Sequence, residues 1–216
     1  MSDTIPIHAI HVDTVRRMNW TPLNQSMPAR MARARRYRFE RDRLLCIGAG
    51  LLMSRVLGIH DESELRQGRF GKPCALGYPA FNLSHSGDWC VLAMHSDDIG
   101  IDIEKIDMRH LSIAPDVFTP GERNWMRENP LERFYTLWTL KESLMKAMGL
   151  GLELSPNSFE VLPFLQDRPI SLLGRTWYAA TGEVTGYRFS VCGRAPIAAL
   201  EWVEYPSEID ADILRT

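Results

Sequence analysis

The sequence predicts an α+β fold, because helices and strand pairs are grouped along the chain and do not alternate strictly as strand-helix-strand units. Residues 5–12 alternate apolar and polar side chains in the manner of a strand, and short runs in residues 81–103 and 159–203 have the length and composition of strands. Residues 130–148 instead carry apolar side chains at helical spacing.

The first half of the chain opens with the strand at residues 5–12. The patterns that follow predict a helix at residues 44–57, a loop at 68–73, and strands at 81–84, 89–94 and 99–103. Ser96, Asp97 and Asp98 separate the last two strands, so we expect these two strands to form a β-hairpin.

Two helix starts mark the second half of the chain. The first is at Thr119, which is followed at once by proline and three residues later by glutamate, and Asn129 repeats this capping scheme. The second helix should cover residues 130–148 and stop at Gly149 or Gly151. Further strands are expected at residues 159–162, 176–180, 187–192 and 197–203, followed by a loose tail.

Composition and charge restrict the class of protein. A chain of 216 residues is long enough for one substantial core or two small subdomains. Its net charge of −2 argues against a dedicated nucleic-acid binder, which carries a basic excess. The four cysteines are scattered without disulfide or metal-site spacing, so we expect reduced thiols. We expect no signal peptide and no membrane span, and hence a cytoplasmic protein that acts on neither membrane nor nucleic acid.

Three carboxylates and two lysines, Lys141 and Lys146, are predicted to serve phosphate chemistry. Asp102 and Glu104 are two apart in an apolar run, so on a strand they project from the same face while the isoleucines beside them face the core. Glu142 and Lys146 are one turn apart on the second helix. Carboxylates and lysines together suit the binding of a divalent metal ion against phosphates.

Each pair also has a simpler interpretation. Two acids at this spacing, taken alone, are more typical of the solvent face of an edge strand, but the residues that flank Asp102 and Glu104 are unusually apolar. Glu142 before Lys146 is the favourable order of a surface ion pair on a helix. Trp138 on the same helix face favours a functional site over a solvent-exposed helix face, because an aromatic side chain on an otherwise polar face usually packs against another part of the protein.

Three other polar segments have open interpretations. Residues 81–87 are a strand end with turn-forming residues, in which His85 beside two serines either satisfies the local backbone or binds a phosphate or ribose group. Lys72 stands in a loop. The arginine-rich residues 30–43 form either a solvated helix face or a local positive potential for phosphates or an acidic partner.

These segments resemble those of one known family in their order and separation. Residues 71–73, 81–87, 100–104 and 138–149 together resemble the surfactin-synthetase-type 4′-phosphopantetheinyl transferases. The likeness is close from Lys72 to Phe159 and holds in outline beyond. It implies two similar α+β subdomains, residues 1–105 and 106–216, related by a pseudo-twofold axis with the active site in the cleft between them.

The resemblance also implies an activity. It implies an enzyme that uses Mg²⁺ to transfer the 4′-phosphopantetheine group from coenzyme A to a serine of an apo acyl or peptidyl carrier protein, releasing adenosine 3′,5′-bisphosphate. The long, two-subdomain chain is expected to act as a monomer.

Individual residues acquire expected roles from the same resemblance. Asp102, Glu104 and Glu142 match the family's metal-binding acids. Glu142 also matches its general base, and Lys146 the lysine that neutralises the leaving bisphosphate. Contacts with coenzyme A are implied for Lys72, Ser84, His85, Lys141 and Arg43. Many members carry a further arginine near the position of Leu45, so this sequence departs from the family pattern just after Arg43. Glu122 falls where the family often has an acid, and its place in the capping pattern accounts for it equally well.

Two other functions remain open on sequence grounds. One is a Mg²⁺-dependent pyrophosphohydrolase that cleaves coenzyme A or a nucleotide with the same acids and needs no carrier protein. The other is a non-catalytic module that binds coenzyme A or a carrier protein and leaves the carrier's mass unchanged.

Overall fold

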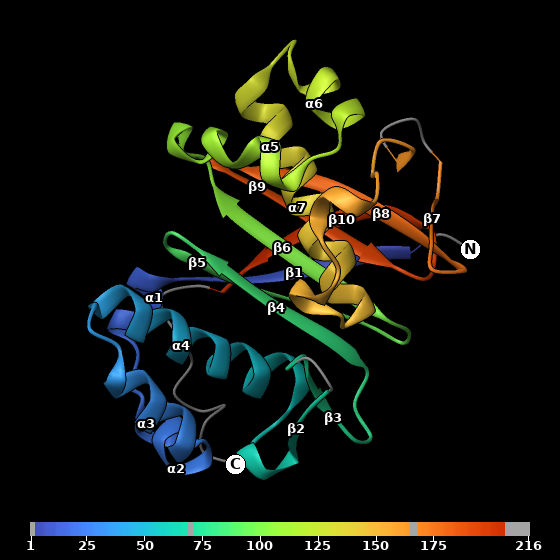
Figure 1. The fold of residues 1–216 in the computed structure, drawn as a ribbon. Helices are drawn as coiled ribbons and strands as arrows, with labels where there is room; N and C mark the ends of the chain where they lie inside the picture. Colours follow the sequence, from blue (N-terminus) through green and yellow to red (C-terminus); the bar gives the residue numbers. More distant parts are fainter. Residues whose placement is uncertain (1–2, 69–70, 165–167, 206–216) are drawn as a thin grey trace.

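The computed structural model describes residues 3–68, 71–164 and 168–205. Within these residues the chain forms two four-stranded sheets and one two-stranded ribbon, with helices against the outer face of each large sheet (Figure 1). The predicted α+β class is confirmed. The predicted loose tail lies outside the described residues.

The first sheet is covered by the N-terminal helices, in the lower half of Figure 1. Its strands, in spatial order, are β10 (Ile197–Glu204), β1 (Asp3–His11), β5 (Trp89–His95) and β4 (Ala80–Ser86). The helices are α1 (Val12–Arg17), α2 (Thr21–Ser26), α3 (Pro28–Arg36) and α4 (Glu40–Leu52), the last extended by a π-helical turn, Met53–Leu57. A short 3-10 helix (Glu62–Glu64) leads to the ribbon of β2 (Leu65–Gln67) and β3 (Pro73–Ala75).

The second sheet is covered by the C-terminal helices, in the upper half of Figure 1. Its strands, in spatial order, are β6 (Ile99–Lys105), β9 (Tyr187–Gly193), β8 (Arg175–Val184) and β7 (Ile170–Leu172). The helices are α5 (Ala114–Val117), α6 (Pro120–Met126) and α7 (Pro130–Met148). Three 3-10 helices, Met108–Ile113, Gly151–Glu153 and Pro156–Ser158, complete this half within the described ranges.

The two sheets pack against each other through one apolar layer. Alternate side chains of β1, including Ile5 and Ile7, meet Ile101 and Ile103 of β6 in this layer. Ile10, on the opposite face of β1, belongs to the core beneath α4. Successive side chains of β1 thus pack into two different cores, one on each face of the sheet. Ile101 and Ile103 of β6 are fully buried, so their predicted inward direction is confirmed.

Both sheets repeat one order of elements. In the first, β1 is followed by helices and then by the antiparallel pair β4 and β5, with β5 next to β1. In the second, β6 is followed by helices and then by the antiparallel pair β8 and β9, with β9 next to β6. β10 returns to the first sheet and runs parallel to β1, so residues after 106 also contribute to that sheet.

The helix boundaries follow their local signals closely. Thr119 caps α6 in a capping box with Glu122, and α7 ends before Gly149, whose φ of +67° suits a residue without Cβ. At Asn129 the predicted helix start is confirmed, although its side chain makes no capping hydrogen bond. The predicted helix at residues 44–57 begins earlier, at Glu40.

Two strand predictions are wrong. β5 and β6 do not form a hairpin, because β5 pairs with β1 and β4 while β6 pairs with β9 in the other sheet. Residues 159–162 form no strand, because their backbone groups bond to buried side chains: the Phe159 carbonyl accepts from Lys141 and the Val161 N–H donates to Glu122. In the described ranges, helix length and apolar character nowhere reach what a bilayer crossing requires.

Candidate active site

Strand β6 and helix α7 lie unusually close together. A Cβ added to Gly100 would lie 2.1 Å from the carbonyl oxygen of Ser143 and 2.3 Å from the nitrogen of Ala147. Backbone atoms cannot yield to such contacts, so only glycine lets α7 pack at this distance. The acids of β6 therefore lie directly beneath the helix that carries Glu142 and Lys146.

The acid pair is held by polar groups from two other elements. Asp102 is 3% exposed, and its Oδ1 accepts hydrogen bonds from Ser84 Oγ at 2.9 Å and from Lys146 Nζ at 2.6 Å. Glu104 is half-buried, and its Oε2 accepts from Ser86 Oγ at 2.7 Å. Its Oε1 accepts a longer bond of 3.4 Å from Trp138 on α7. A solvated edge strand does not describe these residues.

Glu142 lies in the electric field of both acids. Burial raises the pKa of its carboxyl to about 7, and the charges of Asp102 and, to a smaller extent, Glu104 act in the same direction, while Lys146 opposes them. Burial and the charge of Asp102 likewise raise the pKa of Glu104. Lys146 follows Glu142 by one turn of α7 and lies 2.6 Å from Asp102 Oδ1, so the helical glutamate is carried close to the sheet-borne acids.

The same region fits a cation but does not form a finished ligand shell. In the described parts of the chain, no group of three or more His, Cys, Asp or Glu side chains is arranged to hold a metal ion. Oδ2 of Asp102 is nevertheless buried without a hydrogen-bond partner among these residues. A buried anionic oxygen without a partner is costly, and a cation would offset that cost. Carboxylate oxygens are the ligands that Mg²⁺ prefers, so the residues present fit this ion.

Ser84 and His85 point to opposite faces of β4. Ser84 is buried at the acid pair, where its hydroxyl donates to Asp102, and its expected contact with coenzyme A stays a prediction. His85 is exposed on the side of α4 and lines a hollow. Burial of the imidazole and the charge of Lys146 lower the pKa of His85.

Lys72 bridges two elements of the site. Its Nζ donates to the carbonyl oxygens of Ile99 at 2.8 Å and Ala147 at 3.2 Å, which joins the start of β6 to the end of α7. Burial lowers the pKa of Lys72. The structure thus gives Lys72 a contact that aligns strand and helix, and its contact with coenzyme A stays a prediction.

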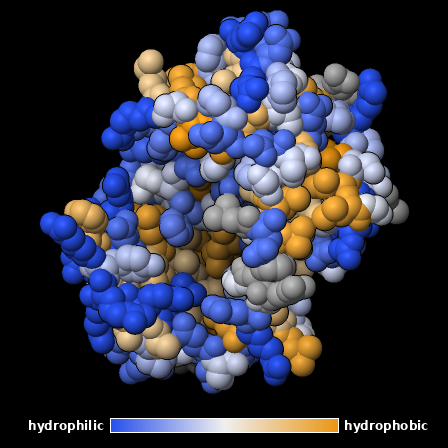
Figure 2. All heavy atoms as spheres, viewed as in Figure 1, coloured by the Kyte–Doolittle hydropathy of each residue, from blue (hydrophilic) through white to orange (hydrophobic). Residues whose placement is uncertain are grey.

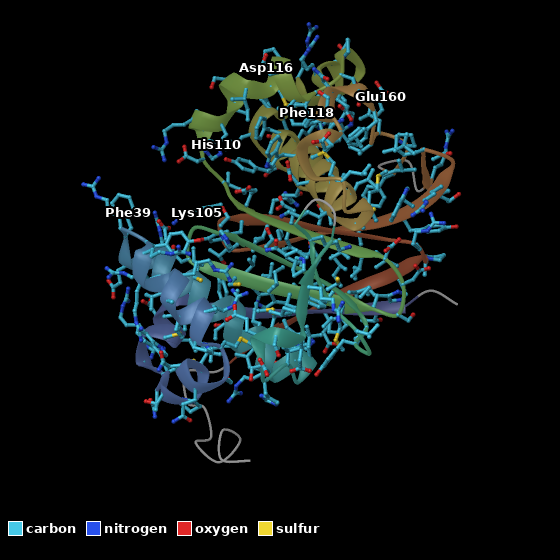
Figure 3. All side chains as sticks on the ribbon, turned by 60° about the horizontal axis from the view of Figure 1, so that its bottom comes forward. Phe39, Lys105, His110, Asp116, Phe118 and Glu160 are labelled. Atoms are coloured by element: carbon cyan, nitrogen blue, oxygen red, sulfur yellow. The ribbon has the colours of Figure 1, made fainter. Side chains whose placement is uncertain are left out.

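The surroundings of Lys141 favour a structural role over the expected contact with coenzyme A. Its side chain is fully buried, and its ammonium lies 2.9 Å from Glu122 Oε2 while donating to the carbonyls of Pro156 and Phe159 at 2.7 and 2.5 Å. These three acceptors use all the hydrogens of the ammonium. Glu122 also completes the Thr119 capping box, so the structural account of Glu122 is confirmed. This cluster lies near Glu160 in Figure 3, well away from Lys105 at the end of β6.

The hollow beside His85 contains cations that sequence reasoning did not single out. It has a volume of about 620 Å³ and lies between α3, α4, β2 and β4. Figure 2 shows a hollow near the centre of the face, with hydrophilic residues below it. Arg30, Arg33 and Arg66 line it together with His85. Arg30 and Arg33 are three apart on one helix, but Arg33 and Arg36 have the same spacing, so the sequence alone does not separate the arginines of the hollow from the others of the run.

Arg43 does not belong to this hollow. It lines a different one with Trp20 and Leu44, whereas Asp42, Leu45 and Cys46 of the same helix line the hollow of His85. A contact of Arg43 with the same ligand as His85 is therefore not supported.

Comparison with known proteins shows which family this chain resembles. The family model described as "4′-phosphopantetheinyl transferase superfamily" matches residues 98–192 of this chain, the span that includes β6, α7 and β9. The chain is 34% identical to 4′-phosphopantetheinyl transferase Sfp of Bacillus subtilis over 185 residues, which are 78% of this chain and 82% of that protein. It is also 34% identical to the L-aminoadipate-semialdehyde dehydrogenase-phosphopantetheinyl transferase of Xenopus laevis, over 63% of this chain and 54% of that protein.

A solved structure also gives a partial match. Holo-[acyl-carrier-protein] synthase of Thermotoga maritima aligns with 46% of this chain and 63% of its own at 15% identity, with a TM-score of 0.36.

The likeness to the curated relatives defines this chain as a phosphopantetheine-transferring enzyme, a class that moves this group from coenzyme A to carrier proteins. The chain belongs to the Sfp-type 4′-phosphopantetheinyl transferases, and the family predicted from its motifs is confirmed.

Proposed function

We propose that this chain transfers 4′-phosphopantetheine from coenzyme A to a serine hydroxyl of an apo acyl or peptidyl carrier protein, with Mg²⁺, and releases adenosine 3′,5′-bisphosphate. The observation that supports this most directly is Glu142, a partly buried carboxyl one helical turn from Lys146, whose pKa is raised to about 7 by burial and by the charge of Asp102. A base with a pKa near neutrality is matched to the removal of a hydroxyl proton as a new bond forms.

The proposed step balances without any further reactant. The serine oxygen attacks the β-phosphorus of coenzyme A, and its proton passes to the carboxylate of Glu142. The bond from the β-phosphorus to the bridging oxygen breaks, and its electron pair leaves with the bisphosphate. Lys146, which lies at the acid pair through its contact with Asp102, supplies positive charge to the leaving group.

The cation is assigned to the acid pair and Glu142. Asp102, Glu104 and Glu142 would hold Mg²⁺, and the unpartnered Oδ2 of Asp102 is the clearest free ligand atom. When bound, the ion supplies positive charge that offsets the repulsion between the pyrophosphate and an incoming oxygen nucleophile.

The nucleotide of coenzyme A is assigned to the hollow beside His85. Its volume is in the range of small-molecule sites, and Arg33, Arg66 and His85 offer donors and positive charge to phosphate oxygens. Glu62, which lies 3.8 Å from Arg33 in an ion pair, keeps that guanidinium at the wall of the hollow.

The remaining expectations about architecture belong to the same proposal. The repeated order β1-β5-β4 and β6-β9-β8, each sheet with a long helix on its outer face, supports a pseudo-twofold pair of subdomains divided near residue 105. One chain then supplies both walls of the cleft, which supports a monomer. The free thiols of Cys46, Cys74, Cys90 and Cys192 suit the reducing cytoplasm.

Mass spectrometry of several apo carrier proteins, incubated with the enzyme, coenzyme A and Mg²⁺, tests the function. We expect the carrier to gain the mass of phosphopantetheine, and the gain to disappear with Glu142→Gln and Asp102→Ala, each reducing the rate by a few orders of magnitude. Wild-type rates in either variant would contradict the assigned roles.

The same experiment separates the other two functions. A pyrophosphohydrolase would cleave coenzyme A without any carrier protein. A binding module would retain coenzyme A or the carrier and leave the carrier's mass unchanged.

A further inference from the structure

The edge strands of the two sheets are joined by side chains and not by a backbone ladder. β4 is the edge of the first sheet, and β6 is the edge of the second. Three side chains of β4 accept backbone N–H groups of β6: Asn82 Oδ1 from Ile101 at 2.9 Å, Ser84 Oγ from Ile103 at 3.4 Å, and Ser86 Oγ from Lys105 at 3.0 Å. We call these three contacts the β4–β6 rungs.

The rungs follow from the alternation of both strands. Asn82, Ser84 and Ser86 lie on one face of β4, while Leu83 and His85 on the other face line the hollow. The N–H groups that they receive belong to every second residue of β6, on the edge that faces away from β9. An edge strand needs partners for such groups, and here side chains provide them.

Two of the rungs continue into the acid pair. A serine hydroxyl has a single proton, and it remains free to be donated when the oxygen accepts a backbone N–H. Ser84 donates that proton to Asp102 at 2.9 Å, and Ser86 donates its proton to Glu104 at 2.7 Å. The Asn82 rung has no such continuation, because Gly100 occupies the corresponding place on β6.

Each hydroxyl therefore selects one oxygen of its carboxylate and leaves the other. Ser84 and Lys146 both bind Oδ1 of Asp102, and Oδ2 is left without a hydrogen-bond partner among the residues that the structure describes. Ser86 binds Oε2 of Glu104, and Oε1 accepts a long 3.4 Å bond from Trp138. The rungs thus fix both the orientation of the acids and the atoms that they offer.

We propose that Ser84 and Ser86 are positioning residues, which anchor Asp102 and Glu104 to the backbone of β6 so that one oxygen of each carboxylate is presented to the divalent cation. The inference rests on the proposed function and assigns to Ser84 a partner other than coenzyme A. Groups that orient metal ligands typically change metal affinity 10- to 100-fold when removed, about the effect expected here.

Binding measurements separate this proposal from a contact with coenzyme A. In Ser84→Ala and Ser86→Ala, we expect the dissociation constant for Mn²⁺, followed by electron paramagnetic resonance, to rise about tenfold or more, together with the Mg²⁺ concentration that gives half-maximal rate. The dissociation constant of coenzyme A without metal should stay within about twofold. Ser86→Thr retains a hydroxyl and should restore the metal affinity.

Two variants control for loss of stability alone. Asn82→Ala removes a rung without touching a carboxylate. Ser190→Ala removes a buried serine hydroxyl that pairs with Thr139 at 2.7 Å, on the strand beside β6. Both should lower the melting temperature and keep the wild-type metal affinity. If Ser84→Ala does not fold, the Ser86 variants decide alone.

The outcomes are distinct. Unchanged metal affinity in Ser86→Ala, or a weakening of coenzyme A binding equal to that of the metal, overturns the proposal. A wild-type enzyme that binds the metal as expected but modifies no carrier protein would instead refute the proposed function and leave the positioning result standing.

Discussion

Lys146 Nζ lies 2.6 Å from Oδ1 of Asp102 and joins the last turn of α7 to the middle of β6. The aspartate side chain is 4% exposed and the lysine side chain 28%, so a partly exposed lysine reaches a buried carboxylate. The contact fixes the helix that carries Glu142 over the strand that carries the acid pair. It also places the lysine charge where a polyanionic substrate would need it.

Replacing Lys146 with methionine should damage both stability and catalysis. The change leaves the buried carboxylate of Asp102 without its cation, so we expect a loss of about 1–3 kcal/mol in the free energy of unfolding. Adding Asp102→Asn should recover part of that loss, because the unpaired charge is removed. Urea unfolding of both single variants and the double variant gives the coupling energy, which we expect at about 0.5–3 kcal/mol. Additive effects would mean that the pair is not formed in solution.

The raised pKa of Glu142 predicts a pH-dependent gain of stability when the residue is made neutral. Folded Glu142, with a pKa of about 7, binds its proton more tightly than unfolded Glu142, whose pKa is near 4.5. The stabilisation from protonation is complete below pH 4.5 and is lost as the pH rises to 7. Glu142→Gln should therefore be more stable than the wild type at pH 8 and no more stable below pH 4.5, although it is inactive.

Thermal unfolding at several pH values measures this difference. Glu153→Gln, at an exposed glutamate just beyond α7, is the control and should show no such trend. An equal melting temperature for Glu142→Gln and wild type at pH 8 would place the carboxyl in solvent and remove it from the field of Asp102 and Glu104.

Local signals predicted much of this site. The capping pattern at Asn129 predicted the start of α7, and Gly149 predicted its end. Both predictions succeed because the ends of a helix depend on only a few neighbouring residues. The spacing of Asp102 and Glu104 gave their common face, because strand alternation is equally local.

Nonlocal partners explain what was missed. Ser96 to Asp98 has the composition of a hairpin turn, but β6 pairs with β9, nearly ninety residues later in the chain. Lys141 and Lys146 stand on one helix, and only the distant Glu122 makes the first a buried structural cation. Ser86 lies in a turn-like motif, and its bond to Glu104 depends on two edge strands meeting. A single sequence contains no direct signal for such contacts.

The buried ion pair of Lys141 and Glu122 predicts a loss of stability without loss of substrate binding. Lys141→Met leaves a fully buried carboxylate and should cost about 3–5 kcal/mol, whereas the double change with Glu122→Gln should cost less. Coenzyme A should bind to folded Lys141→Met as it does to the wild type. Urea unfolding and calorimetry test the two statements. Normal stability combined with weak binding would restore Lys141 as a phosphate contact.

The close approach of α7 to β6 predicts that one methyl group at Gly100 disrupts catalysis. In Gly100→Ala the new Cβ meets the backbone of Ser143 and Ala147, so the helix must shift. Displacement of reacting groups by about 1 Å can cost roughly 100-fold in rate. Gly193→Ala, on the neighbouring strand, is the control because its Cβ would meet only Asp98 O at 3.4 Å. Full activity in Gly100→Ala would show that the spacing is not needed.

The hollow beside His85 predicts which arginine recognises the 3′-phosphate of coenzyme A. Arg33 lines this hollow, whereas Arg35 on the same helix lines a different one and donates to Asn24. A lost charge-assisted hydrogen bond costs about 1.5–3 kcal/mol, so Arg33→Gln should raise KM for coenzyme A roughly 10- to 100-fold.

The substrate that lacks the phosphate makes this test specific. With 3′-dephospho-coenzyme A, Arg33→Gln should behave like the wild type, because the group that Arg33 binds is absent from the substrate. Arg35→Gln removes the same charge from the same helix and should leave both KM values unchanged. If Arg33→Gln weakens both substrates equally, the arginine shapes the wall of the hollow and the 3′-phosphate binds elsewhere. Equal effects of Arg33→Gln and Arg35→Gln would mean that only the general positive potential of α3 attracts the nucleotide.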